Sequence, residues 1–239
     1  MEPVKAPAPL VIISSSPYIH CGSTISAAMR DVLLSLLPAL AAAVYFFGWP
    51  ALSVILTCCL SAVICEALCQ KLMQRPITGL LLAFCLPPEL SLGLAAFGSF
   101  CAVVIGKQVF GGLGSNIFNP AHLGRAILLA SFPAQMTTWT MPWNTAAAEA
   151  VTKATPYTDA VSSATPLAAL RLAESAWQRG LNVDLPSLSA LFWGNVGGSL
   201  GETCVPALLL GGIYLLWRGH IDWRIPAGYI GTVVVITAI

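Results

Sequence analysis

Apolar segments long enough to cross a lipid bilayer dominate this chain, and polar residues are largely confined to the stretches between them. A membrane-crossing helix needs about 20 mostly apolar residues. Such runs extend over about 32–49, 50–72 and 90–110, and they are continuous rather than alternating, unlike the strands of a membrane barrel. With 57% hydrophobic and 9% charged residues, the chain has too few polar side chains to cover a soluble surface. The sequence therefore predicts an all-α polytopic membrane protein.

Charge and cysteine content exclude several other classes of protein. A net charge of +1 offers no basic surface for a nucleic acid. Most of the 8 cysteines lie inside apolar runs, where cysteine packs as a small hydrophobic residue, and they form no tight C-x-x-C pair. We therefore expect no metal site. No G-x-G-x-x-G motif follows a strand, so we expect no NAD to bind to this chain.

Two short apolar pieces, 77–86 and 121–132, are bounded by helix-breaking residues. Pro87-Pro88 ends the first piece, because proline removes a backbone donor and clashes with the preceding turn. A glycine-rich stretch, 111–116, precedes the second, and another glycine-rich break occupies 194–202. Short pieces of this kind are typical of discontinuous helices, whose free backbone groups must be buried in protein or line a cavity.

The glycine-rich breaks supply candidate residues for an ion or cofactor pathway near the middle of the membrane. The ends of half-helices and their free carbonyls can bind ions or a cofactor. Alternatively, the glycines only allow the helices to pack closely. An acidic group beside a membrane helix is costly, so Glu202 indicates function unless it lies at the interface. Glu66 is expected to pair with Lys71 or to be solvated, and the histidines show no ligand spacing. The candidates are Gly112, Gly114, Asn116, Asn119, Asn195, Gly198 and Glu202.

The distribution of Lys and Arg predicts the orientation of the chain. With the N-terminus in the cytoplasm, most of them lie at cytoplasmic ends of spans, and the weakly acidic stretch 133–190 is external. The last apolar run, 227–239, is too short to cross, so we expect the chain to be a fragment of a longer one. The predicted organisation is a cytoplasmic segment (1–30), a first membrane repeat (31–132), an external loop (133–190) and the start of a second repeat (191–239).

The external loop contains the segment Asp159-Ala160-Val161-Ser162-Ser163-Ala164-Thr165-Pro166-Leu167. Taken alone, it is a turn before a helix, with Thr165 as N-cap and Pro166 in the first helical position. It also resembles the flavinylation motif of the RnfD/NqrB family, in which an acidic residue precedes a Ser-x-Ala-Thr-Pro-Leu core. Ala160 departs from the glycine often found there. Further segments resemble the family in the same order: 15–18, 78–83, 107–121 and 131–139.

The resemblance covers essentially the whole chain and implies an inverted-repeat helical bundle with broken half-helices. It implies FMN joined through its phosphate to the Thr165 hydroxyl, on the outer face of a bacterial cytoplasmic membrane. Asp159 would be recognised by the flavin transferase. Ser162 and Ser163 would donate to the phosphate or close the turn, and Ala164 and Pro166 complete the motif. A second flavin is left open.

The same resemblance implies a role in electron transport. The chain would relay electrons between Rnf-type membrane, flavoprotein and iron–sulfur subunits while ferredoxin oxidation and NAD+ reduction move Na+ or H+. RnfD is the nearer relative, because NqrB carries a longer N-terminal extension. Two alternatives stay open: a solute or ion permease with a broken-helix central site, and a structural scaffold without redox activity. The loop around Thr165 discriminates between them, because a permease does not need it.

Overall fold

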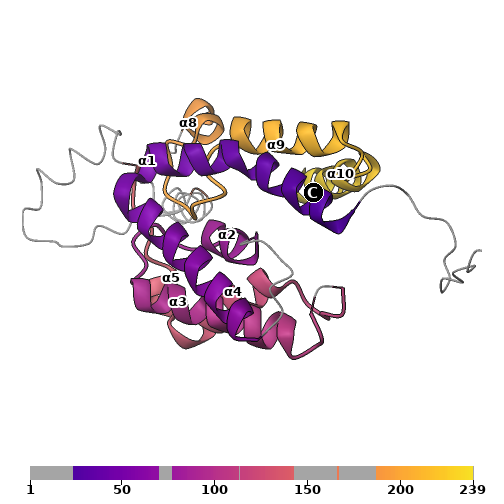
Figure 1. Ribbon diagram of the computed structural model, residues 1–239. Coiled ribbons are helices and arrows are strands. Elements are labelled where there is room, and N and C mark those ends of the chain that lie inside the picture. The colour runs from indigo at the N-terminus through magenta and orange to yellow at the C-terminus, as the bar shows by residue number, and fades with distance from the viewer. Residues whose placement is uncertain (1–23, 70–76, 113, 143–165, 167–186, 239) are drawn as a thin grey trace, which may run out of the picture.

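The computed structural model describes residues 24–69, 77–112, 114–142, 166 and 187–238 (Figure 1). These residues form helices and connecting loops without a strand, which confirms the all-helical prediction. The helices are α1 (Ile25–Leu68), α2 (Ile77–Phe84), α3 (Leu92–Phe100), the π-helix η1 (Cys101–Gln108), α4 (Pro120–Ser131), α5 (Pro133–Met136), α8 (Leu188–Trp193), α9 (Val205–Trp217) and α10 (Arg224–Ala238).

Helix α1 has 44 residues and is folded into two arms by a kink. Its mean hydropathy reaches 2.2, and it is the one described helix that is both long and apolar enough to cross a membrane; three shorter apolar helices accompany it. Gly48 makes the kink with φ 64°, a conformation that side chains with a Cβ rarely adopt. Pro50 begins the second arm, so the predicted boundary between two spans at this point is confirmed.

The start of α1 differs from the prediction. We expected the first helix to begin near Val32, whereas it begins at Ile25. The reason is the N-cap: the Thr24 hydroxyl accepts a hydrogen bond from the Ala27 backbone N–H at 3.2 Å. The predicted polar segment 1–30 therefore includes the first turns of a helix.

The two arms of α1 pack against different helices (Figure 1). The first arm runs beside α9. The second arm packs against α3 and η1, which in turn contact α4, and α2 lies between the two groups. Gly211 of α9 lies directly against the Ser35 backbone carbonyl, where a Cβ would collide. Small residues at such contacts let membrane helices approach closely. One core, centred on Leu82, Leu86, Leu128 and Leu200, joins these helices.

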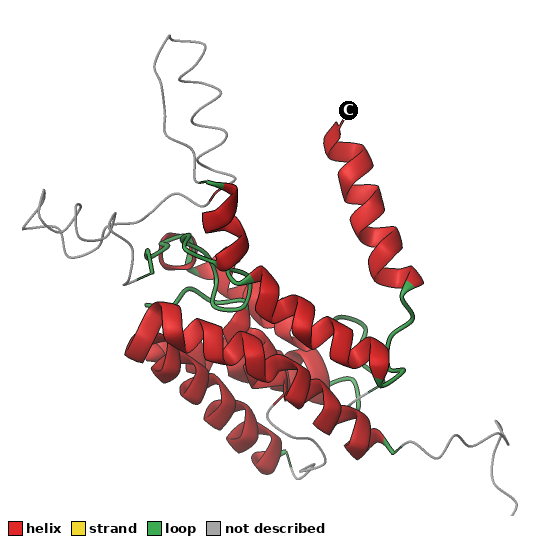
Figure 2. Ribbon diagram, turned by 90° about the horizontal axis from the view of Figure 1, so that it is seen from above, coloured by secondary structure: helices red, strands yellow, loops and turns green. Residues whose placement is uncertain are grey.

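The outer surface of the bundle is strongly apolar. Large hydrophobic side chains are exposed along the second arm of α1 and along α9, for example Leu60, Ile64 and Ile213. Helix α10 projects away from the rest of the bundle (Figure 2), and nearly all its described side chains are exposed. Extended apolar surfaces of this kind mark contact with membrane or with protein partners. This surface is consistent with a membrane protein.

Candidate functional site

The end of α2 and the second glycine-rich break pair with each other through the backbone. Helix α2 ends at Phe84, ahead of the two prolines. The Gly201 N–H donates to the Phe84 carbonyl at 2.9 Å, and the Leu200 N–H donates to the Leu86 carbonyl at 3.1 Å. These bonds satisfy carbonyls that a broken helix leaves without intrahelical partners. The predicted discontinuity after Leu86 is confirmed, and its partner is a segment more than a hundred residues away.

Four polar side chains gather beside this pairing, and we call them the junction cluster: Cys85, His122, Arg125 and Glu202. The Cys85 Sγ lies 4.0 Å from His122 Nδ1. Arg125 and Glu202 lie near enough to the same thiol to act on it electrostatically, with opposite charges. The described residues contain no group of three or more acidic, histidine or cysteine side chains arranged to hold a metal ion. The junction cluster thus offers hydrogen-bond donors and opposite charges beside the broken backbone.

The Glu202 side chain bonds to the backbone of its own loop beside the junction cluster. Its Oε1 accepts a hydrogen bond from the Ser199 N–H at 3.0 Å. A Cβ at Gly198 would lie 2.9 Å from that oxygen, so glycine leaves room for the carboxylate. Asn195 is exposed, and its N–H donates to the Ala190 carbonyl at the end of α8. The structure therefore brings Gly198 and Glu202 together and gives Asn195 a backbone role at a helix end.

The first glycine-rich break bonds within its own loop. η1 ends at Gln108, and Gly112 and Gly114, with φ of 103° and 89°, lie in the loop that follows it. The Asn116 side chain accepts from the Gly114 N–H at 3.3 Å and donates to the Phe118 carbonyl at 2.8 Å. Asn119 caps α4 by accepting from the Ala121 N–H at 3.1 Å. The observed contacts of these candidates are those of a turn and a helix cap, and the pathway assigned to them stays a prediction.

A buried ion pair joins the second arm of α1 to η1. Lys107 Nζ binds Glu66 Oε1, and the side chains are 4% and 3% exposed. The expectation that Glu66 is solvated is wrong, because the packing of η1 places Lys107 against it; Lys71, its other expected partner, lies outside the described residues. Lys107 belongs to a π-helix, a geometry frequent at functional sites. A charged residue inside apolar helices was the available signal, since such residues almost always pair with one another.

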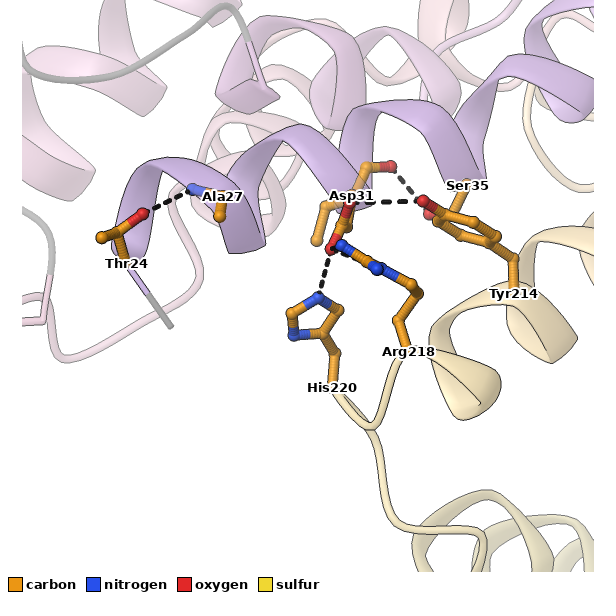
Figure 3. Close-up of polar contacts among 8 residues, drawn as sticks. Thr24, Ala27, Asp31, Ser35, Tyr214, Arg218 and His220 are labelled. Atoms are coloured by element: carbon orange, nitrogen blue, oxygen red, sulfur yellow. Dashed lines mark hydrogen bonds and ion pairs between the residues drawn. The ribbon is translucent and has the colours of Figure 1, made fainter. Parts of the chain in front are cut away.

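A second buried carboxylate ties α1 to the end of α9 (Figure 3). Asp31, 4% exposed, receives hydrogen bonds from Tyr214 at 3.2 Å and Arg218 at 3.0 Å, and lies 2.7 Å from His220 Nε2. We call these four residues the Asp31 clasp. His220, whose spacing indicates no metal ligand, contacts a carboxylate that the sequence did not point to. Sequence spacing could not have predicted the clasp, because Asp31 lies 183 to 189 positions before its three partners.

Most of the predicted flavin-attachment motif lies outside the described residues. This applies to Asp159, Ser162, Ser163, Ala164 and Thr165. Pro166 is described, as a half-buried residue in helical conformation. That conformation agrees with proline in the first turn of a helix that follows Thr165.

Comparison with known proteins identifies relatives over nearly the whole chain. Residues 12–239 match the model of the NQR2, RnfD, RnfE family. The chain is 42% identical over 235 residues to a subunit of the proton-translocating ferredoxin:NAD(+) oxidoreductase complex of Clostridium ljungdahlii, covering 94% of this chain and 68% of the relative. It is 42% identical to a subunit of the Na(+)-translocating ferredoxin:NAD(+) oxidoreductase complex of Acetobacterium woodii, covering 93% and 67%. A subunit of the ion-translocating oxidoreductase complex of Stutzerimonas stutzeri is also 42% identical, with 91% and 67% covered.

Proposed function

Because the chain belongs to the NQR2, RnfD, RnfE family, we propose that it is a membrane subunit of an ion-translocating ferredoxin:NAD+ oxidoreductase complex. The observation that carries this proposal is similarity along 91–94% of the chain to three proteins named as subunits of ion-translocating oxidoreductase complexes. The chain does not catalyse the overall reaction alone. Its partners are the other membrane, flavoprotein and iron–sulfur subunits of the complex.

We further propose that Thr165 carries FMN as a phosphoester. The support is the local sequence, in which Thr165 precedes Pro166, a pattern that predicts an N-cap position for Thr165. Backbone N–H groups and the helix dipole at such a terminus favour a phosphate. Ser162 and Ser163 donate to that phosphate or close the turn. Asp159 directs the flavin transferase to the loop.

The flavin, when attached, supplies one- and two-electron transfer chemistry to the complex. The role of the chain is to hold the cofactor and to position it. The tether keeps the cofactor on the outer face, where free FMN would be lost to solvent. The helical bundle fixes the distance between that face and the partner subunits, so electrons can be relayed between them.

The proposed location is the bacterial cytoplasmic membrane, with several spans, the N-terminus in the cytoplasm and the 133–190 loop outside. The Asp31 clasp is consistent with this orientation, because it joins the start of α1 to the end of α9, two ends that the orientation places in the cytoplasm. The coupled ion is Na+ or H+. Two relatives with the same 42% identity are named for different ions, so identity does not discriminate between them.

In-gel flavin fluorescence tests the proposal directly. The chain is expressed with its flavin transferase, denatured in SDS, and illuminated in the gel. We expect a fluorescent band for the wild type and none for Thr165→Ala. Thr158→Ala, a threonine in the same loop, is the matched control and should keep the band. A wild type without a band, or a Thr165→Ala variant that keeps it, would refute the flavin assignment and favour the permease or scaffold alternative.

A further inference from the structure

The turn that joins α9 to α10, residues 217–224, exposes aromatic and basic side chains together; we call it the α9–α10 turn. Trp217 and Trp223 are 81% and 64% exposed. Arg224, the first residue of α10, is exposed as well. Tryptophan is enriched where the apolar core of a membrane meets water, because its ring is apolar and its N–H is polar. The α9–α10 turn therefore has the composition expected where a chain meets lipid headgroups.

The Asp31 clasp holds Arg218 in place within this turn (Figure 3). Its Nε and Nη2 atoms each lie 3.0 Å from Asp31 Oδ2. A guanidinium has five N–H donors, so these contacts leave donors for a further acceptor. The Arg218 side chain is 48% exposed, whereas the Asp31 side chain is buried. The carboxylate thus fixes one edge of the guanidinium and leaves the rest of it at the surface.

Two further arginines surround Arg218. Arg30 precedes Asp31 on α1, and both Arg30 and Arg224 are exposed and form no salt bridge in the described part of the chain. The exposed Asp222 carboxylate accepts a hydrogen bond from the Arg224 backbone N–H at 3.0 Å, at the start of α10. Three arginines thus face solvent, while one of the two carboxylates beside them is buried beneath the surface.

We propose that the α9–α10 turn, together with Arg30, binds the headgroup of an anionic phospholipid. Guanidinium groups bind phosphate oxygens through paired, charge-assisted hydrogen bonds. The proposed orientation places this turn at the cytoplasmic surface, where the membrane is negatively charged and attracts basic side chains. The inference adds a lipid ligand to the proposed function and does not depend on attachment of the flavin.

The two helices beside the turn supply apolar surface for the acyl chains. Helix α10 projects away from the bundle (Figure 2), and Ile225 and Ile230 on it are exposed. Leu210 and Ile213 on α9 are exposed too. The 13 residues of α9 extend over about 20 Å at 1.5 Å per residue, more than half of a bilayer core of about 30 Å. A lipid bound at the turn can therefore keep its acyl chains against α9 across one leaflet.

Native mass spectrometry of the full chain tests this proposal. The chain is expressed without its flavin transferase, stripped of lipid in a neutral detergent, and titrated with phosphatidylglycerol, phosphatidylcholine or inorganic phosphate. We expect phosphatidylglycerol to bind more tightly than phosphatidylcholine, because only the former carries a net negative charge. Inorganic phosphate at equal concentration should not displace phosphatidylglycerol, because it has no acyl chains to contact the helices.

Arg224→Gln tests the turn itself and leaves the Asp31 clasp intact. We expect its affinity for phosphatidylglycerol to fall about fivefold, the usual contribution of one basic side chain at a lipid surface. Arg179→Gln removes the same charge from the segment 133–190 and is the matched control, so it should bind as the wild type does. Equal unfolding midpoints without lipid would show that both variants fold.

Three results would overturn the proposal. The first is equal affinity of the wild type for the two lipids, and the second is unchanged affinity in Arg224→Gln. The third is displacement of phosphatidylglycerol by inorganic phosphate, which would show a site for a free anion. A dimer that forms without lipid and excludes phosphatidylglycerol would assign this surface to a second copy of the chain and would also overturn the proposal.

Discussion

The guanidinium of Arg218 contacts the Asp31 carboxylate through two nitrogens, Nε and Nη2, each 3.0 Å from Oδ2. This contact connects α1 to the residue that caps the C-terminal end of α9, 187 positions later. Tyr214 and His220 bind the same carboxylate, so one buried acidic group receives contacts from three side chains. The clasp therefore holds the start of α1 against the end of α9.

Removal of the Asp31 charge should loosen this connection. Asp31→Asn keeps the size of the side chain but leaves Arg218 without its carboxylate, so we expect a lower midpoint temperature of unfolding in detergent. Arg30→Gln is the matched control, because Arg30 is adjacent, exposed and without a salt bridge in the described part of the chain. Equal midpoints for the two variants would show that the clasp does not stabilise the bundle.

Glu66 and Lys107 should contribute to the stability of the protein as a coupled pair rather than independently. Loss of one partner of a buried pair costs about 3–5 kcal/mol, because the other charge is left buried without compensation. We expect Lys107→Met and Glu66→Leu each to lower stability by about that amount. The double variant should be more stable than either single variant, since no unpaired charge remains. A double-mutant cycle of unfolding midpoints measures the coupling, and additive effects would contradict it.

Position 211 should not tolerate a residue with a side chain, because Gly211 lies against the backbone of Ser35. A Cβ at residue 211 would collide with the Ser35 carbonyl, so Gly211→Ala should separate α9 from α1 and cost about 1–3 kcal/mol. Gly212 has open space around its Cβ position, and Gly212→Ala should be neutral or slightly stabilising. Thermal unfolding in detergent compares these neighbours. The packing explanation fails if Gly212→Ala is the more harmful change.

Asp159 should affect attachment of the flavin rather than stability of the bundle. If the transferase recognises this carboxylate, Asp159→Asn lowers the fluorescent fraction of the SDS band while the amount of protein stays constant. Asp184→Asn removes an acidic group from the same segment, 133–190, and serves as the control. Equal labelling of Asp159→Asn and wild type would remove Asp159 from the attachment motif.

Several features of the fold were predictable because local chemistry decides them. The kink in α1 follows from Gly48 and Pro50, and the end of α2 follows from Pro87 and Pro88. The beginning of α1 was misplaced because apolar content, rather than the Thr24 cap, was used to set it. Helix η1 was predicted as part of one continuous span, but its π geometry was not, because no local signal in the sequence specifies it.

The candidate site was only partly predictable. Gly198 and Glu202 were expected together because they share one break, and the structure places them in contact. Cys85 and His122 come from different elements, and neither attracted attention by spacing. The cavity lined by Phe47, Pro88 and Thr140 could not be predicted either, because its walls come from three segments distant in the sequence.

The membrane environment, the helical class, the positions of the breaks and the family all follow from the amino-acid sequence, because they depend on composition, on local backbone preferences and on motifs read in order. The partners of the buried polar groups follow from the packing of the helices. Glu66 meets Lys107, Leu200 meets Leu86, and Asp31 meets Arg218 and His220. A buried charge or a free carbonyl must find a partner, but which distant residue provides it depends on how the helices pack in three dimensions.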